Sequence, residues 1–205
     1  MHLRYRSILL VPAFLMTFGG VVSGQVLINE IRVDNSGADT DEYFELVGTP
    51  GQSLAGLFYI VLGDGSSSSN SGGCSGTVES ITDLSTFSIQ ADGYFAASNS
   101  AAAPTLTGYD ASVALAFENS DNVTHLVVSG FTGSLTQDLD TNDDGVFDVT
   151  PWTMIVDSVG LSEGKTFVCP VSGTNDEWLY SANIVGPDGT FAAAGMRRCS
   201  AGLMW

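Results

Sequence analysis

Short runs of β-branched and aromatic residues recur along the chain, and clusters of Gly, Asn, Asp and Ser separate them. Within the runs, apolar and polar positions alternate or the run is apolar throughout, which is typical of strands. Beyond residue 24, no segment keeps a helical period over about 11 or more residues. Strands are expected at 26–33, 43–47, 57–62, 94–97, 114–117, 123–128, 154–161 and 166–168. Short strands with regular turn signals predict an all-β sandwich or barrel.

The first 24 residues have a different pattern. Arg4 and Arg6 precede an apolar run that begins at Ile8, and small residues end this run at Gly24. These are the parts of a secretory signal peptide, and the run is shorter than the roughly 20 residues of a membrane-spanning helix. We therefore predict a signal peptide at 1–24 and a secreted or cell-surface domain at 25–205. No membrane insertion is expected after cleavage.

Charge narrows the choice of partners. The chain has six Lys and Arg residues and 23 Asp and Glu residues. Loss of Arg4 and Arg6 with the signal peptide leaves four basic residues against 23 acidic ones, a formal charge of −19. Nucleic acids and anionic membranes are bound mainly through Lys and Arg, so such a domain repels both. We predict that nucleic acid is not a partner.

Three cysteines remain in the predicted domain, namely Cys74, Cys169 and Cys199. In an oxidising compartment this odd number allows at most one internal disulfide. We favour the pair Cys169 and Cys199, because Cys74 lies in a Ser- and Gly-rich run. Cys74 is then free or bonded to another molecule.

Several short motifs follow one another in a distinctive order. Ile-Asn-Glu at 28–30 comes before Asp-Glu-Tyr-Phe-Glu-Leu at 41–46 and Leu-Ala-Gly-Leu-Phe-Tyr at 54–59. A later block runs from 139 to 160 and contains Pro-Trp-Thr at 151–153. This order resembles the lamin tail domain family, in its secreted bacterial type. The resemblance implies an immunoglobulin-like β-sandwich that serves as a binding or accessory module. The segment from Gly195 resembles the entry to a further strand, so the chain is truncated after Trp205 or has an unusual end.

Oxygen-bearing side chains alternate before a glycine in residues 138–148, here called the aspartate loop. Calcium takes about six to eight hard oxygen ligands, and a tight loop supplies them from alternate positions with glycine at the bend. The last position of such a loop, usually Glu, is Pro151, so Asp138 or Asp157 is expected to complete the shell from outside. The predicted ligands within the loop are Asp140, Asn142, Asp144, the Val146 carbonyl and Asp148. A solvated acidic turn is the alternative.

Three further candidates have simpler interpretations. The acidic residues between the first two strands, Asp34, Asp39, Asp41 and Glu42, lack alternating spacing and predict a solvated loop. His125 is expected to be a half-buried strand residue. Residues 160–164 match G-x-S-x-G, but no helix and no later histidine follow them, so we predict a turn.

The sequence therefore contains no recognisable catalytic set. We expect a non-catalytic binding or adhesion module with a calcium-stabilised loop, whose partner is an extracellular protein or glycan. Two alternatives stay open. One is an extracellular hydrolase, or an accessory domain of one, of nuclease or glycosidase type. The other is a structural surface protein that associates with itself.

Overall fold

The computed structural model describes residues 24–34, 41–65, 75–99, 108–115, 117–118, 122–164, 178–188 and 192–199. These residues contain ten strands and no helix. The strands are β1 (Leu27–Arg32), β2 (Tyr43–Val47), β3 (Leu57–Gly63), β4 (Thr77–Asp83), β5 (Tyr94–Asn99), β6 (Ala111–Val113), β7 (Val123–Ser129), β8 (Met154–Leu161), β9 (Ile184–Val185) and β10 (Gly195–Arg197). The predicted signal peptide, apart from Gly24, and the expected strand at 166–168 lie outside the described residues.

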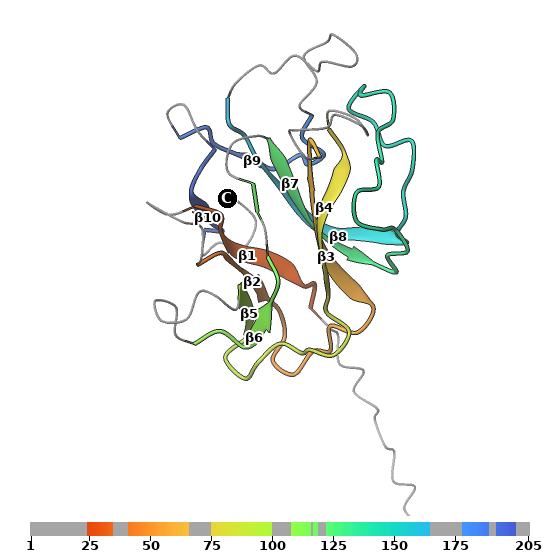
Figure 1. The fold of residues 1–205 in the computed structure, drawn as a ribbon. Helices are drawn as coiled ribbons and strands as arrows, with labels where there is room; N and C mark the ends of the chain where they lie inside the picture. Colours follow the sequence, from red (N-terminus) through yellow and green to blue (C-terminus); the bar gives the residue numbers. More distant parts are fainter. Residues whose placement is uncertain are drawn as a thin grey trace, which may run out of the picture.

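Two five-stranded sheets form a sandwich (Figure 1). The first has the order β10-β1-β2-β5-β6 and the second the order β4-β3-β7-β8-β9. Pairing is antiparallel except at two edges, where β6 runs parallel to β5 and β9 parallel to β8. The all-β prediction is confirmed, and the architecture is compatible with an immunoglobulin-like sandwich.

The main core fills the space between the sheets. Alternate residues of the facing strands supply it, among them Phe44, Tyr59, Phe95 and Val127, all of which are inaccessible to solvent. The rings of Phe44 and Tyr59 stack with centroids 3.9 Å apart. Burial of each large apolar side chain stabilises the fold by about 1.5–3 kcal/mol, so this layer holds the two sheets together.

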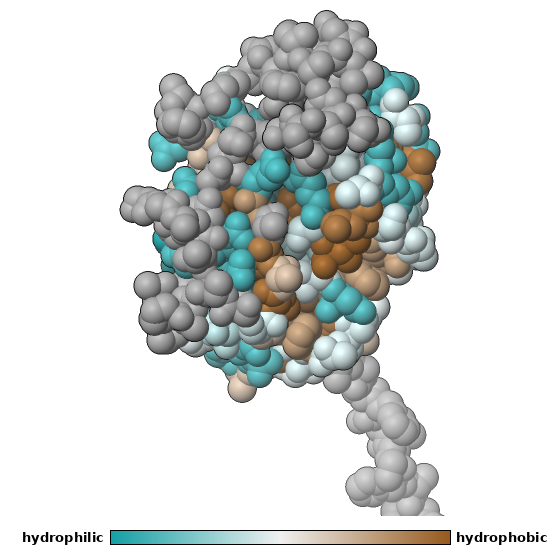
Figure 2. All heavy atoms as spheres, viewed as in Figure 1, coloured by the Kyte–Doolittle hydropathy of each residue, from teal (hydrophilic) through white to brown (hydrophobic). Residues whose placement is uncertain are grey.

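A second core covers the outer face of the second sheet. Successive strand residues point to opposite faces, so Ile60 and Leu126 leave the main core and pack outside with Leu139. Leu139 belongs to the long connection between β7 and β8, which lies over this face together with Tyr180. The central strands β3 and β7 are consequently buried on both sides. On the face shown in Figure 2, hydrophobic residues gather in the middle and hydrophilic residues surround them.

Strand prediction failed where the strands are short or polar. β4 was missed because Ser and Thr occupy its inward positions, and β9 and β10 have only two and three residues. The expected strand at 114–117 is wrong, since the strand ends at Val113. Leu115 and Phe117 are nevertheless buried in the main core, which explains the apolar pattern without strand pairing.

Candidate cation sites

The aspartate loop folds around the side chain of Asp140, which is inaccessible to solvent. Asp140 Oδ1 accepts a hydrogen bond from the Asp144 amide at 3.2 Å, and Oδ2 accepts one from the Gly145 amide at 2.8 Å. Gly145 has a φ of 82°, in the left-handed region that glycine adopts without strain. The glycine therefore stands at the bend, as its spacing predicted.

Most of the other predicted ligands in the loop face the solvent. Asn142, Asp144, Val146 and Asp148 are exposed. Asn142 Oδ1 accepts the Asp144 amide at 3.1 Å, and Asp144 Oδ1 accepts the Val146 amide at 3.0 Å. Because a side-chain oxygen has two lone pairs, one such bond leaves capacity for a cation. No three carboxylates of this loop, whose residues are all described, come within 4.8 Å of one another.

Asp138 stands at the entrance to the loop. Its Oδ1 accepts a hydrogen bond from the Asp140 amide at 3.0 Å. Burial raises the pKa of Asp138, and the nearby carboxylates of Asp143, Asp140 and Asp148 raise it further against the effect of that amide. The loop thus concentrates negative charge that a bound cation would neutralise.

Aromatic residues hold the loop from outside. The Tyr180 hydroxyl donates to Asp140 Oδ2 at 2.6 Å, and the Tyr180 ring stacks on Phe147 with centroids 4.4 Å apart. Trp178 Nε1 donates to the Asp143 carbonyl at 2.9 Å. A Cβ on Gly145 would stand 2.7 Å from the Trp178 ring, so the bend and the indole are in close contact. The sequence offered no signal for these contacts, because both aromatic residues lie far beyond the loop in the chain.

Asp157 does not join the aspartate loop. It lies on β8 and points into the main core, where its Oδ2 accepts from the Ile28 amide at 2.7 Å and from Arg198 Nη2 at 2.6 Å. The loop covers the opposite face of the same sheet through Leu139. Asp157 is therefore half of a buried ion pair between the two sheets, and the structure places it apart from the other predicted ligands.

The prediction of a solvated acidic loop before β2 is wrong for two of its residues. Asp41 is buried and pairs with Arg32 at 2.8 Å. Glu42 is 3% exposed, and its Oε1 accepts the Phe117 amide at 2.9 Å. Both carboxylates have local donors that offset their loss of solvent. Asp39 lies outside the described residues, whereas Asp34 is half-buried.

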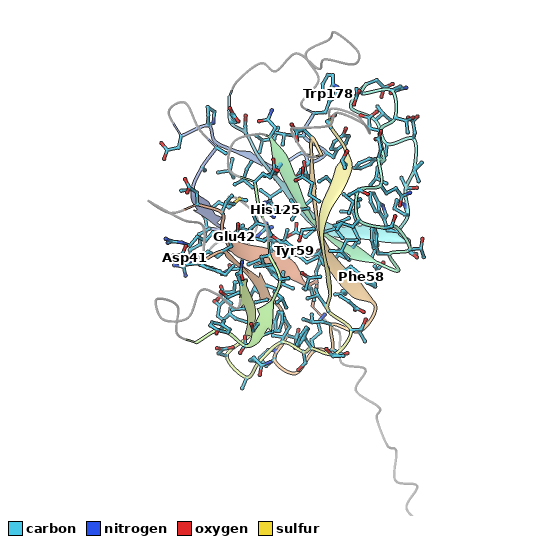
Figure 3. The ribbon with its side chains drawn as sticks, in the orientation of Figure 1. Asp41, Glu42, Phe58, Tyr59, His125 and Trp178 are labelled. Carbon is cyan, nitrogen blue, oxygen red and sulfur yellow. The ribbon has the colours of Figure 1, made fainter. Side chains whose placement is uncertain are left out.

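His125 is a strand residue, as predicted, but it is fully rather than half buried (Figure 3). Its Nδ1 lies 2.9 Å from the Tyr59 hydroxyl, and its ring meets Phe117 edge-on. Burial lowers the pKa of His125 to about 3, so the ring stays neutral near pH 7. No solvent reaches it.

The G-x-S-x-G match ends β8 instead of opening a helix. Ser162 Oγ accepts the Gly164 amide at 3.1 Å, and the Ser162 amide donates to the Val185 carbonyl at 2.9 Å. Cys199 is exposed and free of a disulfide, so the favoured pair of Cys169 and Cys199 is not formed in the structure. Cys74 and Cys169 lie outside the described residues.

One acidic cluster was not predicted. Oxygens of Asp64, Glu79 and Glu118 all lie within 4.8 Å of one another. Two of these residues come from the second sheet and its loop, whereas Glu118 follows β6 of the first sheet. The three residues are far apart in the sequence, so they form no short motif that could have predicted the cluster.

Comparisons of the chain with family models, with curated proteins and with solved structures find no match. The resemblance to the lamin tail domain family stays a prediction. Function is therefore inferred from the residues and their geometry.

Proposed function

We propose that this chain is an exported, non-catalytic binding module in which calcium stabilises the aspartate loop. The observation that carries the proposal is the loop itself, where buried Asp140 anchors a turn whose alternate oxygen ligands face the solvent. The residues that would hold the ion are Asp138, Asp140, Asn142, Asp144, the Val146 carbonyl and Asp148. Carboxylate, amide and carbonyl oxygens are the donors that calcium prefers.

Calcium would supply positive charge to a loop that pairs with no arginine of the described residues. Within the described residues, Arg32, Arg197 and Arg198 pair with Asp41, Glu30 and Asp157, all away from the loop. A bound ion would offset the burial and the repulsion from neighbouring carboxylates that together raise the pKa of Asp138. Its role is to order a loop, which requires no catalytic group.

A binding role agrees with the state of the residues that usually perform catalysis. His125 is sealed from solvent and neutral, so it is a poor proton acceptor for a bound substrate. Ser162 makes local hydrogen bonds within a strand end. We propose an extracellular protein or glycan as the partner, since the acidic chain repels nucleic acid.

Thermal unfolding with and without calcium tests the loop. Extracellular calcium modules bind with dissociation constants of about 0.1–1 mM. At one to ten times that concentration the linkage term is about 0.4–1.4 kcal/mol, and each kcal/mol raises the melting temperature by about 2–4 °C in a domain of this size. We expect this rise for the unmodified protein and its loss in Asp144→Ala.

Asp92→Ala is the matched control. Asp92 is exposed like Asp144, and its Oδ1 likewise accepts the amide two residues later, that of Tyr94, at 3.0 Å. Both substitutions remove one charge and one such bond, but only Asp144 belongs to the loop. An equal calcium response in Asp144→Ala and Asp92→Ala would show that the loop binds no calcium.

A further inference from the structure

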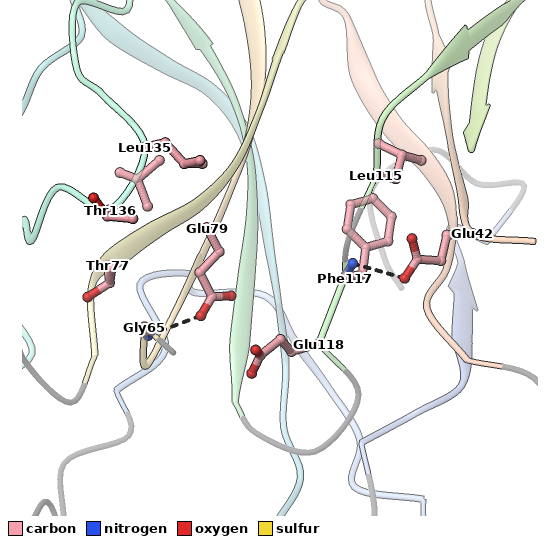
Figure 4. Close-up of a pocket in the computed structure, with 10 residues that line it drawn as sticks. Glu42, Gly65, Thr77, Glu79, Leu115, Phe117, Glu118, Leu135 and Thr136 are labelled. Atoms are coloured by element: carbon pink, nitrogen blue, oxygen red, sulfur yellow. Dashed lines mark hydrogen bonds between the residues drawn. The ribbon is translucent and has the colours of Figure 1, made fainter. Parts of the chain in front are cut away.

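The outer face of the first sheet has a pocket of about 220 Å³, here called the tyrosine pocket. Its lining includes Glu30, Tyr43, Glu45, Ala96, Ser98 and Tyr109. A larger cavity, of about 490 Å³, opens between the sheets, where β4 faces the segment that follows β6 (Figure 4). The tyrosine pocket lies instead on the face of a sheet, where the surface of another protein can meet it.

Strand pairing builds the tyrosine pocket. Phe44 points into the main core, so its neighbours on β2, Tyr43 and Glu45, point to the outer face. On β5, Ala96 pairs with Glu45 and Ser98 pairs with Tyr43. Because Ala and Ser are small, β5 forms a low floor beside the longer side chains of β2.

Two glutamates lie directly opposite each other in this pocket. Glu30 of β1 pairs with Glu45 of β2, and like charges in such a position destabilise a sheet. The Tyr43 hydroxyl donates to Glu30 Oε1. Asn29 Nδ2 donates to Glu45 Oε1 at 2.6 Å. A carboxylate has about four lone-pair positions, so both glutamates keep capacity for a further donor.

Arg197 is the protein cation beside these glutamates, and its contact is loose. Its Nε lies 3.5 Å from Glu30 Oε2, whereas charge-assisted hydrogen bonds are about 2.7–2.9 Å long. Its side chain is 71% exposed. Exposed ion pairs contribute little stability, so a cation from another molecule can replace Arg197 at small cost.

The electrostatics of Glu45 favour an added positive charge. Burial raises the pKa of Glu45, and the charges of Glu30 and Asp92 raise it further. The Asn29 hydrogen bond and the charge of Arg197 lower it, but the pKa stays above its ordinary value. A cation between the two glutamates would therefore relieve a repulsion that the protein's own groups leave in place.

The aromatic rings make the pocket suitable for an organic cation. The face of a tyrosine ring carries negative potential and attracts an ammonium group within about 6 Å of its centre. Burial and the hydrogen bond to Glu30 raise the pKa of Tyr43, so its ring stays uncharged. Tyr109 lines the same pocket. Rings and carboxylates together attract an ammonium group and repel an anion.

We propose that the tyrosine pocket binds the ammonium group of a lysine side chain on a basic protein partner. The inference rests on the proposed function as a binding module and identifies the chemistry of its partner. An ammonium group is compact and has three N–H donors, so it bonds to both glutamates while its methylene groups lie against the tyrosine rings. The formal charge of −17 attracts a basic protein.

The size of the pocket also favours a single side chain. Its volume of about 220 Å³ is below the roughly 300–1,000 Å³ of pockets that enclose whole small ligands. A lysine on a protein surface inserts only its side chain, and the rest of the partner then lies on the surrounding sheet. The site uses none of the residues of the aspartate loop.

Nuclear magnetic resonance of ¹⁵N-labelled protein tests the proposal, with Nα-acetyl-lysine methylamide as the probe. The titration contains a chelator, so its outcome does not depend on calcium in the aspartate loop. We expect saturable shifts of the Glu45 and Ala96 amide signals. The same probe acetylated on Nε has no charge and should cause no shift. Tetramethylammonium, which has no N–H donor, should bind more weakly than the lysine probe.

Three substitutions in or beside the pocket should change the affinity for the lysine probe in different directions. Glu45→Gln should weaken binding about tenfold, because a charge-assisted hydrogen bond is lost. Tyr109→Ala should weaken it about two- to fivefold through loss of the ring. Arg197→Gln should strengthen it about twofold or more, because the competing cation is removed.

Tyr94→Ala and Asp92→Asn are the matched controls. Tyr94 is 38% exposed and lies on β5, and Asp92 is an exposed carboxylate close enough to act on Glu45, but neither lines the pocket. Tyr94→Ala should leave the affinity unchanged, and Asp92→Asn should weaken it less than Glu45→Gln does.

Several outcomes would overturn the lysine site. They are an absence of saturable shifts, equal shifts with the Nε-acetylated probe, tighter binding of tetramethylammonium, and equal effects of Tyr94→Ala and Tyr109→Ala. If Glu45→Gln fails to fold, the exposed Arg197→Gln still decides, since unchanged or weaker binding in that variant contradicts the proposal. Absent shifts beside a normal calcium response would overturn this site and leave the aspartate loop standing.

Discussion

At the scale of single residues, the contact between Tyr59 and His125 shows how one hydrogen bond holds an ionisable ring in an apolar core. The Tyr59 hydroxyl and His125 Nδ1 are 2.9 Å apart, and Phe44 and Phe117 surround the two rings. His125 Nε2 has no partner among the described residues. Protonation of the ring would place an unpaired charge in this core, which is why burial lowers its pKa so far.

Acid should therefore destabilise the protein through His125. Below about pH 6.5 the unfolded chain binds a proton that the folded chain refuses until about pH 3, so stability falls as the pH falls. The loss from this one group is about 1.4 kcal/mol between pH 7.5 and 5.5. Urea unfolding at the two pH values measures it.

His125→Asn separates this effect from that of other acid-sensitive groups. The substitution lowers stability at pH 7.5, because it leaves a cavity in the core. It also removes the titrating ring, so the difference between the two pH values should shrink by about 1.4 kcal/mol. An unchanged difference would mean that His125 is protonated as easily in the folded protein as in the unfolded one.

At the scale of strands, a charge pair joins β8 to the residue after β10, and both partners also bond to the backbone of β1. Asp157 Oδ2 accepts both the Ile28 amide and Arg198 Nη2, and Arg198 Nε donates to the Ile28 carbonyl at 2.9 Å. Both side chains are less than one-tenth exposed. The pair thus fixes the position of one sheet on the other through directional bonds, in addition to apolar contact.

Removal of one partner should cost more than removal of both. Arg198→Met leaves the Asp157 carboxylate buried without its cation, and the expected loss of stability is about 3–5 kcal/mol. The double substitution Asp157→Asn with Arg198→Met leaves no buried charge, so it should recover part of the loss. Chemical unfolding of the single and double variants measures the difference. A double variant less stable than Arg198→Met would contradict this role.

Local patterns predicted most strands but not the contacts between distant segments. Alternation found β1, β2, β3, β5, β7 and β8, because these strands place large apolar residues on a core face. β4 was not predicted, because its bulge at Glu79 shifts the alternation of apolar and polar residues and because its inward positions are Ser and Thr. The spacing of the aspartate loop was readable because its ligands are neighbours in sequence. Asp64, Glu79 and Glu118 meet only after two sheets have packed.

At the scale of the whole molecule, the acidic charge favours expansion. The chain has a formal charge of −17, and within the described part its arginines are already paired. Like charges on a compact chain repel one another, and added salt screens this repulsion beyond about 8–10 Å. Stability should therefore depend on ionic strength as well as on calcium.

Sodium chloride and calcium chloride at equal ionic strength distinguish screening from binding. We expect sodium chloride to raise the melting temperature gradually, and calcium chloride to raise it further at millimolar concentration. In Asp144→Ala, the two salts should act alike. Equal effects of both salts on the unmodified protein would reduce the role of calcium to screening.

The position of Arg198 also bears on how the fold is reached. Its amide bonds to the Asn29 carbonyl and its guanidinium to the Ile28 carbonyl, 170 residues away in sequence. Contacts over such separations carry a large loop-closure entropy and are typical of slow-folding β proteins. β1 lies between β10 and β2 in its sheet, so both of its edges are paired only after β10 has joined. During that interval its hydrogen-bonding groups stay open to other chains, so rapid dilution should favour correct folding over aggregation.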